Sequence, residues 1–511
     1  MKKYIIILII GASLFVILKG APLYSRSSER LADYDTLFSE GSKTRSVNTK
    51  AYAHFIMGAM LDNDGKFKEA AEEYAKALQY DSKSSVIHTR LALNYIRQTK
   101  YEDATSHLNA AIANDPDDSK ARFILALLYT ITKQYDKATL QYEEIIKRTP
   151  NDLKALASLA DLYVIQEKIK EAIDVYEAIL KEDKNSSLAH FNLGIFYSKT
   201  DKYDEAISHF DEAIKLEPDY LEAILSRAIV YELKGQTAKA ISDYKRVLEI
   251  EPLNTKVYRL LAQAYYKDKK VSDAVSTYKL IIELEPEKID GYLELAYLYL
   301  NEKNADEVIK LLEKAVALKD KSRQNLAYIV MGLAYSQKGM SKESLESYKK
   351  AVEAAPEDSD GYFYLGAAYE RQGQKDLAVQ NLKKVIELDP KHDEALNYLG
   401  YMYAEEGANL DEAIGLIKRA LEVSPDNGAY VDSLGWAYYQ KGMTDEAIAQ
   451  LEKAISLYGK DSIIYDHLGD AYQKKGMTEK AKEAWKKSLE LDPKREAVRQ
   501  KLEKSNRAQK Q

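Results

Sequence analysis

The sequence predicts an all-helical fold, a solenoid of about 13 helical hairpins stacked side by side. The first observation is that tyrosine recurs at intervals of 34 residues, at Tyr95, Tyr129, Tyr163, Tyr197, Tyr231, Tyr265 and Tyr299. The second is that apolar residues within each interval follow helical rather than strand spacing. A fixed period of this length is the signature of an array of helical hairpins, in which each unit buries its apolar face against its neighbours.

Thirteen units follow one another from residue 51 to residue 495. Counting positions from 1 to 34, the units begin at Ala51, Ser85, Ser119, Leu153, Ser187, Leu221, Thr255, Ile289, Asn325, Ser359, Asp393, Gly428 and Ser462. Two extra residues fall near 320–323 and one falls within 407–410. Insertions are tolerated in loops, so we expect both to lie between helices.

Each unit predicts two helices joined by a tight turn. Apolar or small residues at positions 4, 7, 8 and 11 form one stripe of the first helix, and positions 20, 24 and 27 form the stripe of the second. Position 8 is alanine or glycine throughout, which lets the two helices approach closely. Glycine is frequent in the turn, and nine of the ten prolines end the second helix.

The amino-terminal residues 1–24 predict a signal or a membrane anchor. Lys2 and Lys3 precede an uncharged run, Tyr4–Leu18, that ends at Lys19. The run is shorter than the ~20 residues of a spanning helix, so a cleaved export signal and an uncleaved anchor both stay open. Residues 25–50 are polar and predict a linker. At the other end, residues 496–511 predict a capping helix followed by a basic tail.

The composition excludes several classes of function. The 511 residues carry a net charge of −7, so no global charge points to nucleic acid. Cysteine is absent, which excludes disulfides, thiolate metal sites and a cysteine nucleophile. The seven histidines are scattered, and the ones at position 4 (His54, His88, His190) are interpreted as packing residues. We expect no enzyme, no cofactor and no metal.

The recurring residues resemble the tetratricopeptide repeat. The match rests on small residues at positions 8, 20 and 27, tyrosine at 11, an aromatic residue or leucine at 24 and proline at 32, and it covers residues 51–495. The last units, with YLGYMYAEEG, DSLGWAYYQKG and DHLGDAYQKKG, are similar to a subgroup of exported bacterial repeat proteins. The resemblance implies a right-handed superhelix whose first helices line a concave, protein-binding groove.

The positions that the resemblance turns toward the groove differ between the two halves of the array. In the first half they are apolar, and the candidate binding residues are Phe55, Phe123, Phe191 and Ile195. In the second half they are aromatic and acidic, and the candidates are Phe363, Tyr364, Tyr398, Tyr401, Asp432, Trp436, Tyr439, Asp466 and Asp470. An exposed apolar stripe marks an interaction surface. Self-packing between neighbouring first helices is the alternative for the apolar half.

These observations predict a non-enzymatic scaffold that binds protein or peptide segments in the groove. The alternative is a chaperone-like assembly factor that holds exported or unfolded substrates on the apolar half. The amino-terminal segment predicts a membrane contact and a bacterial inner membrane location with a periplasmic array, or a soluble periplasmic protein if the signal is cleaved. No nucleic acid partner is expected, and self-association, partner identity and membrane orientation stay open.

Overall fold

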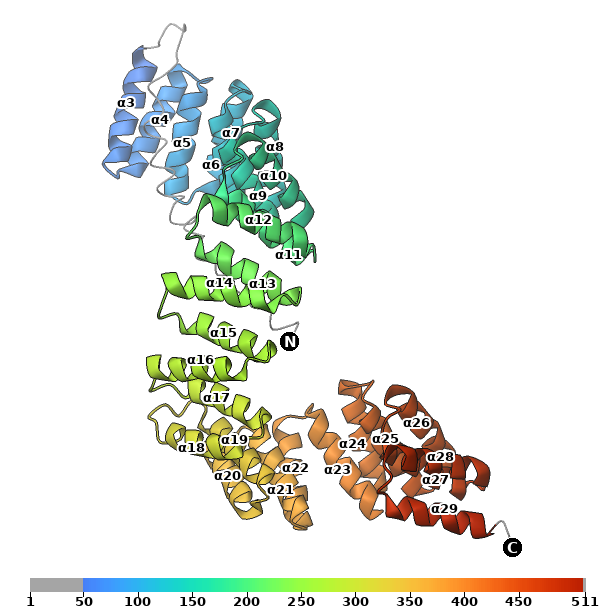
Figure 1. Ribbon diagram of the computed structural model, residues 1–511. Helices are drawn as coiled ribbons and strands as arrows, with labels where there is room; N and C mark the ends of the chain where they lie inside the picture. Colours follow the sequence, from blue (N-terminus) through green and yellow to red (C-terminus); the bar gives the residue numbers. More distant parts are fainter. Residues whose placement is uncertain (1–48, 509–511) are drawn as a thin grey trace. The chain divides into compact units, whose positions relative to one another are not determined.

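The computed structural model describes residues 49–508, and every regular element in that range is an α-helix. There are 27 such helices, which form 13 consecutive hairpins and one final helix, α29 (Glu496–Ala508). Figure 1 shows each helix turning back antiparallel on the one before it. The predicted all-α solenoid of hairpins is confirmed, with helices that start at or within two residues of the predicted unit boundaries.

The chain divides into two compact units, and the first ends at Ala274. Its hairpins are formed by α3 (Thr49–Asn63) and α4 (Phe67–Tyr80), α5 (Ser85–Arg97) and α6 (Tyr101–Asn114), α7 (Ser119–Ile131) and α8 (Tyr135–Arg148), α9 (Leu153–Ile165) and α10 (Ile169–Glu182), α11 (Ser187–Lys199) and α12 (Tyr203–Leu216), and α13 (Leu221–Leu233) and α14 (Thr237–Ile250). They are followed by α15 (Thr255–Lys267) and by α16 (Val271–Leu284), within which the first unit ends.

The second compact unit begins at Val275. After α16 it contains α17 (Ile289–Asn301) and α18 (Ala305–Ala315), α19 (Gln324–Gln337) and α20 (Ser341–Ala354), α21 (Ser359–Arg371) and α22 (Lys375–Leu388), α23 (Asp393–Glu406) and α24 (Leu410–Val423), α25 (Gly428–Lys441) and α26 (Thr444–Leu457), and α27 (Ser462–Lys474) and α28 (Thr478–Leu491). Helix α29 packs on α28.

The turn inside each hairpin uses one backbone conformation at position 15. This residue has a positive φ in all thirteen hairpins, at glycine in seven of them, as in Gly235 (φ +73°), and at other residues in the rest, as in Lys133 (φ +59°). Glycine adopts this left-handed conformation without the steric cost that other residues incur. The predicted role of the turn glycines is therefore confirmed, and the same geometry extends to units without glycine.

The start of most first helices is fixed by the polar residue that precedes them, whereas Tyr220, Lys288 and Arg323 give no side-chain cap to α13, α17 and α19. The side chains of Ser84, Asp152 and Asn254 each accept a hydrogen bond from a backbone N–H in the first turn. Such caps satisfy donors that the helix itself leaves unpaired. A polar residue at this position therefore separates one hairpin from the next.

Two kinds of contact build the core. Inside a hairpin, position 8 of the first helix lies against the large side chain at position 24 of the second. For example, a Cβ added at Gly194 would lie 2.6 Å from the ring of Phe210. Between hairpins, positions 3 and 10 of the first helix are buried in units 2 to 13. A Cβ added at Gly291, a position 3 residue, would meet Ile281 and Ile282 of the preceding second helix. The preceding hairpin therefore covers these positions.

The predicted amino-terminal anchor lies outside the described residues. Among residues 49–508, no helix combines the length and the apolar character that a membrane span requires. The run Tyr4–Leu18 and most of the predicted linker belong to the part of the chain that the structure leaves undescribed.

Candidate functional site

The apolar candidates of the first unit are mostly core residues. Phe123, Phe191 and Ile195 expose 7%, 3% and 7% of their surface, and Phe55 is half-buried. The ring of Phe191 contacts Phe210 of the same hairpin (centroids 6.0 Å apart) and Tyr220 of the next loop (5.1 Å). The second helix of the same hairpin and the following loop therefore cover Phe191, whereas the alternative considered above was packing between neighbouring first helices. These four residues do not form an open apolar stripe, so they give no support to the chaperone-like alternative.

The aromatic candidates of the second unit lie on its first helices and form two groups of contacting rings, one around Phe363 and one around Trp436. Phe363 and Tyr364 on α21 are in edge contact, with ring centroids 5.6 Å apart, and Phe363 also contacts Tyr398 on α23 at 6.1 Å. These side chains are half-buried, whereas Tyr297 on α17 is 43% exposed. We call Tyr297, Phe363, Tyr364, Tyr398, Tyr401, Trp436 and Tyr439 the aromatic row.

Carboxylates hold the phenol groups of this row. The hydroxyl of Tyr398 donates a hydrogen bond to Glu370 (3.2 Å), and burial together with that carboxylate raises the pKa of Tyr398 to about 12. Burial and the neighbouring Glu405 carboxylate likewise raise the pKa of Tyr401. Both phenols therefore stay protonated at neutral pH and act as hydrogen-bond donors.

Trp436 lies at the centre of a stack of rings. Its indole stacks on His467 (centroids 4.2 Å apart, planes at 17°) and on Tyr439 (4.9 Å, 13°). The ammonium of Lys474 lies 4.4 Å from the centroid of the Tyr439 ring and donates to the Tyr439 carbonyl at 2.8 Å. The Nε1 atom of Trp436 is buried and has no hydrogen-bond partner. The stack thus joins three rings and leaves the indole N–H of Trp436 buried without a hydrogen-bond acceptor.

The acidic candidates are not the open acidic surface that the sequence predicted. Asp432 is 7% exposed, and both its carboxylate oxygens lie within 3.2 Å of His467 Nδ1. Asp466 is 6% exposed and accepts hydrogen bonds from Arg495 and Lys501, both at 2.8 Å. Burial of a carboxylate is costly unless it is paired, so these residues hold the fold together.

Asp470 completes the same buried network. It accepts hydrogen bonds from Trp485 Nε1 (3.1 Å) and from Lys501 (2.6 Å). Burial raises the pKa of Asp470, an effect that outweighs the opposing influence of Lys501. For Lys501, the hydrogen bonds to Asp466 and Asp470 outweigh burial and raise its pKa.

Arg495 and Lys501 are the residues that the sequence reasoning missed. They belong to the segment interpreted as a cap with a basic tail, but Lys501 occupies position 6 of a fourteenth first helix if the count of 34 is continued from Ser462. Had the period been continued, it would have placed a lysine beside the aspartates of α27. Two of the positive charges near the end of the chain, on Arg495 and Lys501, are therefore paired with carboxylates of α27.

Histidines meet in pairs on the first unit. Nδ1 of His88 lies 2.9 Å from Nδ1 of His107, and His190 and His209 repeat this arrangement at 3.1 Å. His209 also stacks on Tyr197, with centroids 5.4 Å apart. Within the described range, no three histidine or carboxylate side chains gather as a metal site would require.

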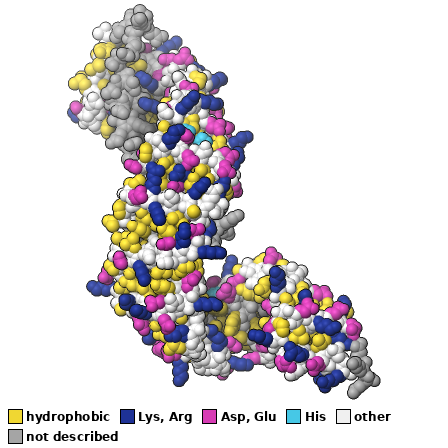
Figure 2. Space-filling view, in the orientation of Figure 1, with side chains coloured by type: hydrophobic (Ala, Val, Ile, Leu, Met, Phe, Trp, Pro, Cys, Tyr) yellow, Lys and Arg dark blue, Asp and Glu magenta, His cyan; other side chains and the backbone are white. Residues whose placement is uncertain are grey.

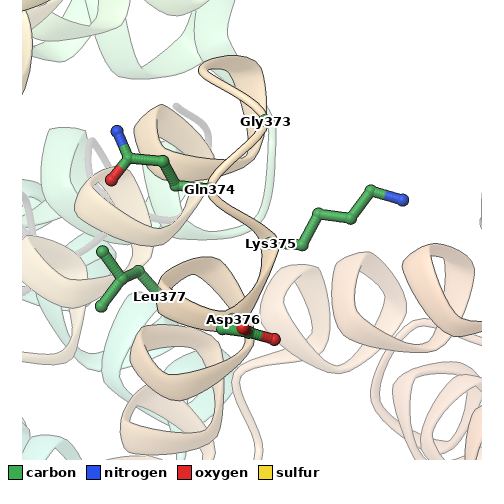
Figure 3. Close-up of a pocket in the computed structure, with 5 residues that line it drawn as sticks. All are labelled: Gly373, Gln374, Lys375, Asp376 and Leu377. Carbon is green, nitrogen blue, oxygen red and sulfur yellow. The ribbon is translucent and has the colours of Figure 1, made fainter.

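The outer surface mixes charges of both signs. Figure 2 shows lysine, arginine and acidic side chains interspersed with apolar ones over the visible face. One surface pocket lies at the turn between α21 and α22, lined by Gly373, Gln374, Lys375, Asp376 and Leu377. The Lys375 side chain points away from those of Gln374 and Leu377 (Figure 3) and pairs with Glu406 at 2.7 Å. This pocket gathers no further charged or aromatic group.

Comparison with protein families places repeats of one kind along most of the described chain. Models described as tetratricopeptide repeats match residues 63–128, 233–287, 289–322, 332–373, 359–392, 435–476 and 462–495. The chain therefore belongs to the class of solenoid proteins that are built from repeated helical hairpins. Its hairpins are tetratricopeptide repeats. Residues 97–257 also match the model described as the C-terminal ARM domain of tetratricopeptide repeat protein 21.

Solved structures with a similar arrangement are distant in sequence. The crystal structure of the APC/C hetero-tetramer Cut9-Hcn1 contains a chain that is 18% identical over 89% of this chain and 96% of that one, with a TM-score of 0.42. A chain of the Naa15/Naa10 structure bound to HypK-THB is 14% identical, over 90% and 91% of the two chains, with a TM-score of 0.36. The search of curated proteins finds no match.

The predicted location is wrong. The match of residues 97–257 to tetratricopeptide repeat protein 21 points to a eukaryotic type of protein, which overturns the bacterial inner membrane and periplasmic assignments. The supposed bacterial exported subgroup likewise has no support in the family matches. The prediction was based on the charge and length of Tyr4–Leu18, a pattern that does not identify the organism.

Proposed function

We propose that the protein is a non-enzymatic scaffold that binds a protein segment along the aromatic row of its second compact unit. The observation that carries this proposal is the stack of Trp436 with Tyr439 and His467, with ring centroids 4.9 Å and 4.2 Å apart. Tryptophan and tyrosine supply large contact area at low entropic cost and dominate the energetics of protein interfaces.

The phenols of Tyr398 and Tyr401 and the carboxylates beside them favour a particular kind of partner. They present protonated hydroxyls next to Glu370 and Glu405, and the Tyr439 ring already holds the ammonium of Lys474 over its face. Aromatic faces and carboxylates together attract cationic side chains. A segment with lysine or arginine between apolar residues fits this surface.

A photo-cross-linking amino acid at position 297 tests the proposal, because Tyr297 is the most exposed member of the row. The same amino acid at Tyr458, which is 55% exposed and lies outside the row, is the control. We expect a distinct protein to be cross-linked from position 297, and its yield to fall when Phe363 and Tyr398 are changed to alanine. Equal products from both positions would refute binding along the row.

A further inference from the structure

The cap at the start of α23 differs in chemistry from the caps of the other first helices. His392 precedes α23, and its Nδ1 atom accepts a hydrogen bond from the backbone N–H of Ala395 at 3.2 Å. In eight other first helices of the described chain the accepting atom is a side-chain oxygen, from Ser84, Asp118, Asp152, Ser186, Asn254, Asp358, Asn427 or Asp461. Histidine is the one residue type in this set that ordinarily titrates between about pH 5 and pH 8.

The hydrogen bond to Ala395 fixes the position of the proton on the His392 ring. Because Nδ1 accepts from an N–H, it carries no proton, so the proton of the neutral ring lies on Nε2. When the ring gains a second proton, Nδ1 becomes a donor that faces another donor, the N–H of Ala395. The positive end of the helix dipole also repels a charged ring. The cap of α23 therefore requires that His392 is neutral.

A carboxylate lies on the other side of the ring. Nε2 of His392 is 3.7 Å from Oδ1 of Asp360, in the first turn of α21. The histidine side chain is only 12% exposed, whereas that of Asp360 is more than half exposed. The other charged residues beside the ring are its neighbours along the chain, Asp389, Lys391, Asp393 and Glu394. A carboxylate at this distance attracts a protonated ring, while the cap stabilises the neutral one.

The ring of His392 also contacts the aromatic row. Its centroid lies 5.1 Å from that of Phe363, and the two planes meet at 31°. Phe363 in turn contacts Tyr364 and Tyr398, and Tyr398 belongs to α23, the helix that His392 caps. A movement of the His392 ring is therefore passed to Phe363 by direct contact and to Tyr398 through the first turn of α23.

We propose that His392 is a proton-operated switch at the start of α23. Protonation breaks the cap and turns the ring from Ala395 toward Asp360, which frees the first turn of α23 and withdraws the ring from Phe363. The switch is a property of the fold and needs no bound partner. Its consequence for binding rests on the proposed function: a segment that contacts Phe363 and Tyr398 is released more readily as the pH falls.

Amide hydrogen exchange of the full-length protein, resolved to single residues by mass spectrometry, tests the switch. Each exchange rate is divided into the rate of an unstructured chain at the same pH, so that the protection obtained is free of the intrinsic pH dependence. Between about pH 7.5 and pH 5.5 we expect protection of the Ala395 amide to fall about 2- to 30-fold, the range that loss of an N-cap produces. The Tyr430 amide, which Asn427 caps at the equivalent position, is the internal control and stays unchanged.

Two variants complete this test. His392→Asn supplies a cap that does not titrate, as Asn427 does for α25, so we expect the Ala395 amide to keep its protection at both pH values. An equal fall in the unaltered protein and in His392→Asn, or no fall in either, would overturn the proposal. Asp360→Asn removes the attraction for the charged ring, so protection should be lost at a lower pH. Loss at an unchanged pH would contradict the turn toward Asp360.

A second measurement observes the ring itself. In full-length protein whose imidazoles carry nitrogen-15, the magnetic resonance signals of His392 are identified by their absence from His392→Asn. At about pH 7.5 we expect the chemical shift of an unprotonated nitrogen for Nδ1 and that of a protonated nitrogen for Nε2. A proton on Nδ1 at this pH would overturn the switch, because the cap could not form, without affecting the proposed binding function.

Discussion

Glycine at position 8 is retained for lack of space. In the second unit, a Cβ at Gly400 would lie 2.6 Å from Ile417 and 3.0 Å from the carbonyl oxygen of Ala413, whereas Gly415 in the adjacent helix has nothing within 4 Å. Both are helical, so alanine is intrinsically favoured at each by roughly 1 kcal/mol. The difference between the stability changes caused by alanine at these two sites therefore measures the cost of overpacking at Gly400.

Gly400→Ala is accordingly expected to destabilise the protein by about 1–3 kcal/mol, because Ile417 and the backbone of α24 must move apart. Gly415→Ala is expected to stabilise it by up to about 1 kcal/mol. Urea denaturation followed by circular dichroism measures both. A stabilising Gly400→Ala would show that the helices separate at no cost.

The histidine pairs make the first unit sensitive to acid. Burial, together with the paired histidine, lowers the pKa of His107 and of His209 below their ordinary value of 6.5. The folded chain therefore binds fewer protons than the unfolded chain once the pH falls to that value. Stability contributed by the neutral pairs is present above pH 6.5 and is lost as the pH falls below it.

Replacing His107 and His209, which are both half-buried, with glutamine removes this dependence. Between pH 7.5 and pH 5.5, on either side of the ordinary histidine value of about 6.5, we expect the melting temperature of His107→Gln/His209→Gln to fall less than that of the unaltered protein. Thermal unfolding at several pH values provides the measurement. An identical fall in melting temperature for both proteins would mean that folding does not lower the pKa values of the paired histidines.

At the scale of the element, α29 is attached by charge as well as by apolar packing. Val498 is fully buried against the last hairpin, while Lys501 bridges Asp466 and Asp470. Removing one partner of a buried pair leaves the other with its desolvation cost uncompensated. The carboxylate of Asp466 keeps Arg495, but Asp470 keeps only the indole N–H of Trp485.

Lys501→Met therefore tests the contribution of this bridge. We expect a loss of about 1–3 kcal/mol in the free energy of unfolding, together with faster hydrogen exchange in α27 and α29. Lys504→Met, at an exposed position of the same helix, is the matched control and is expected to leave both unchanged. Equal effects of the two substitutions would assign the loss to helix propensity or to net charge.

The sequence predicted elements far better than it predicted which faces are open. Each hairpin was predictable because the pattern of small residues, aromatic residues and proline recurs, so errors at one unit are corrected by the others. The exposure of an individual side chain is not indicated by any such recurring pattern. Phe191 is hidden by Tyr220 of the following loop, and Asp466 by Arg495 and Lys501, and none of these partners is signalled by the residue itself.

At the scale of the whole molecule, packing is local along the chain. The extensive contacts in the described part join helices that are adjacent in sequence or separated by one other helix. In such an array, stability is a sum of hairpin terms and nearest-neighbour terms, and no single core unites distant repeats.

A perturbation in one hairpin is therefore expected to remain near it. In Gly400→Ala, hydrogen exchange measured by mass spectrometry should rise in α21–α26 and stay unchanged in α5–α8, because opening occurs in contiguous units. A uniform rise in exchange over all helices would instead indicate that the array unfolds as one cooperative body.

The left-handed turn at position 15 also bears on how such a chain can change its length. Because all thirteen hairpins turn through the same residue geometry, a copied or deleted unit of the full period leaves every surviving hairpin in its original register. A deletion of another length inside a helix rotates the residues that follow it and exposes their apolar stripe, whereas the loops accept one or two extra residues, as between α18 and α19. Recombination is thus expected to add or remove whole hairpins, so that relatives of this chain differ by multiples of one repeat.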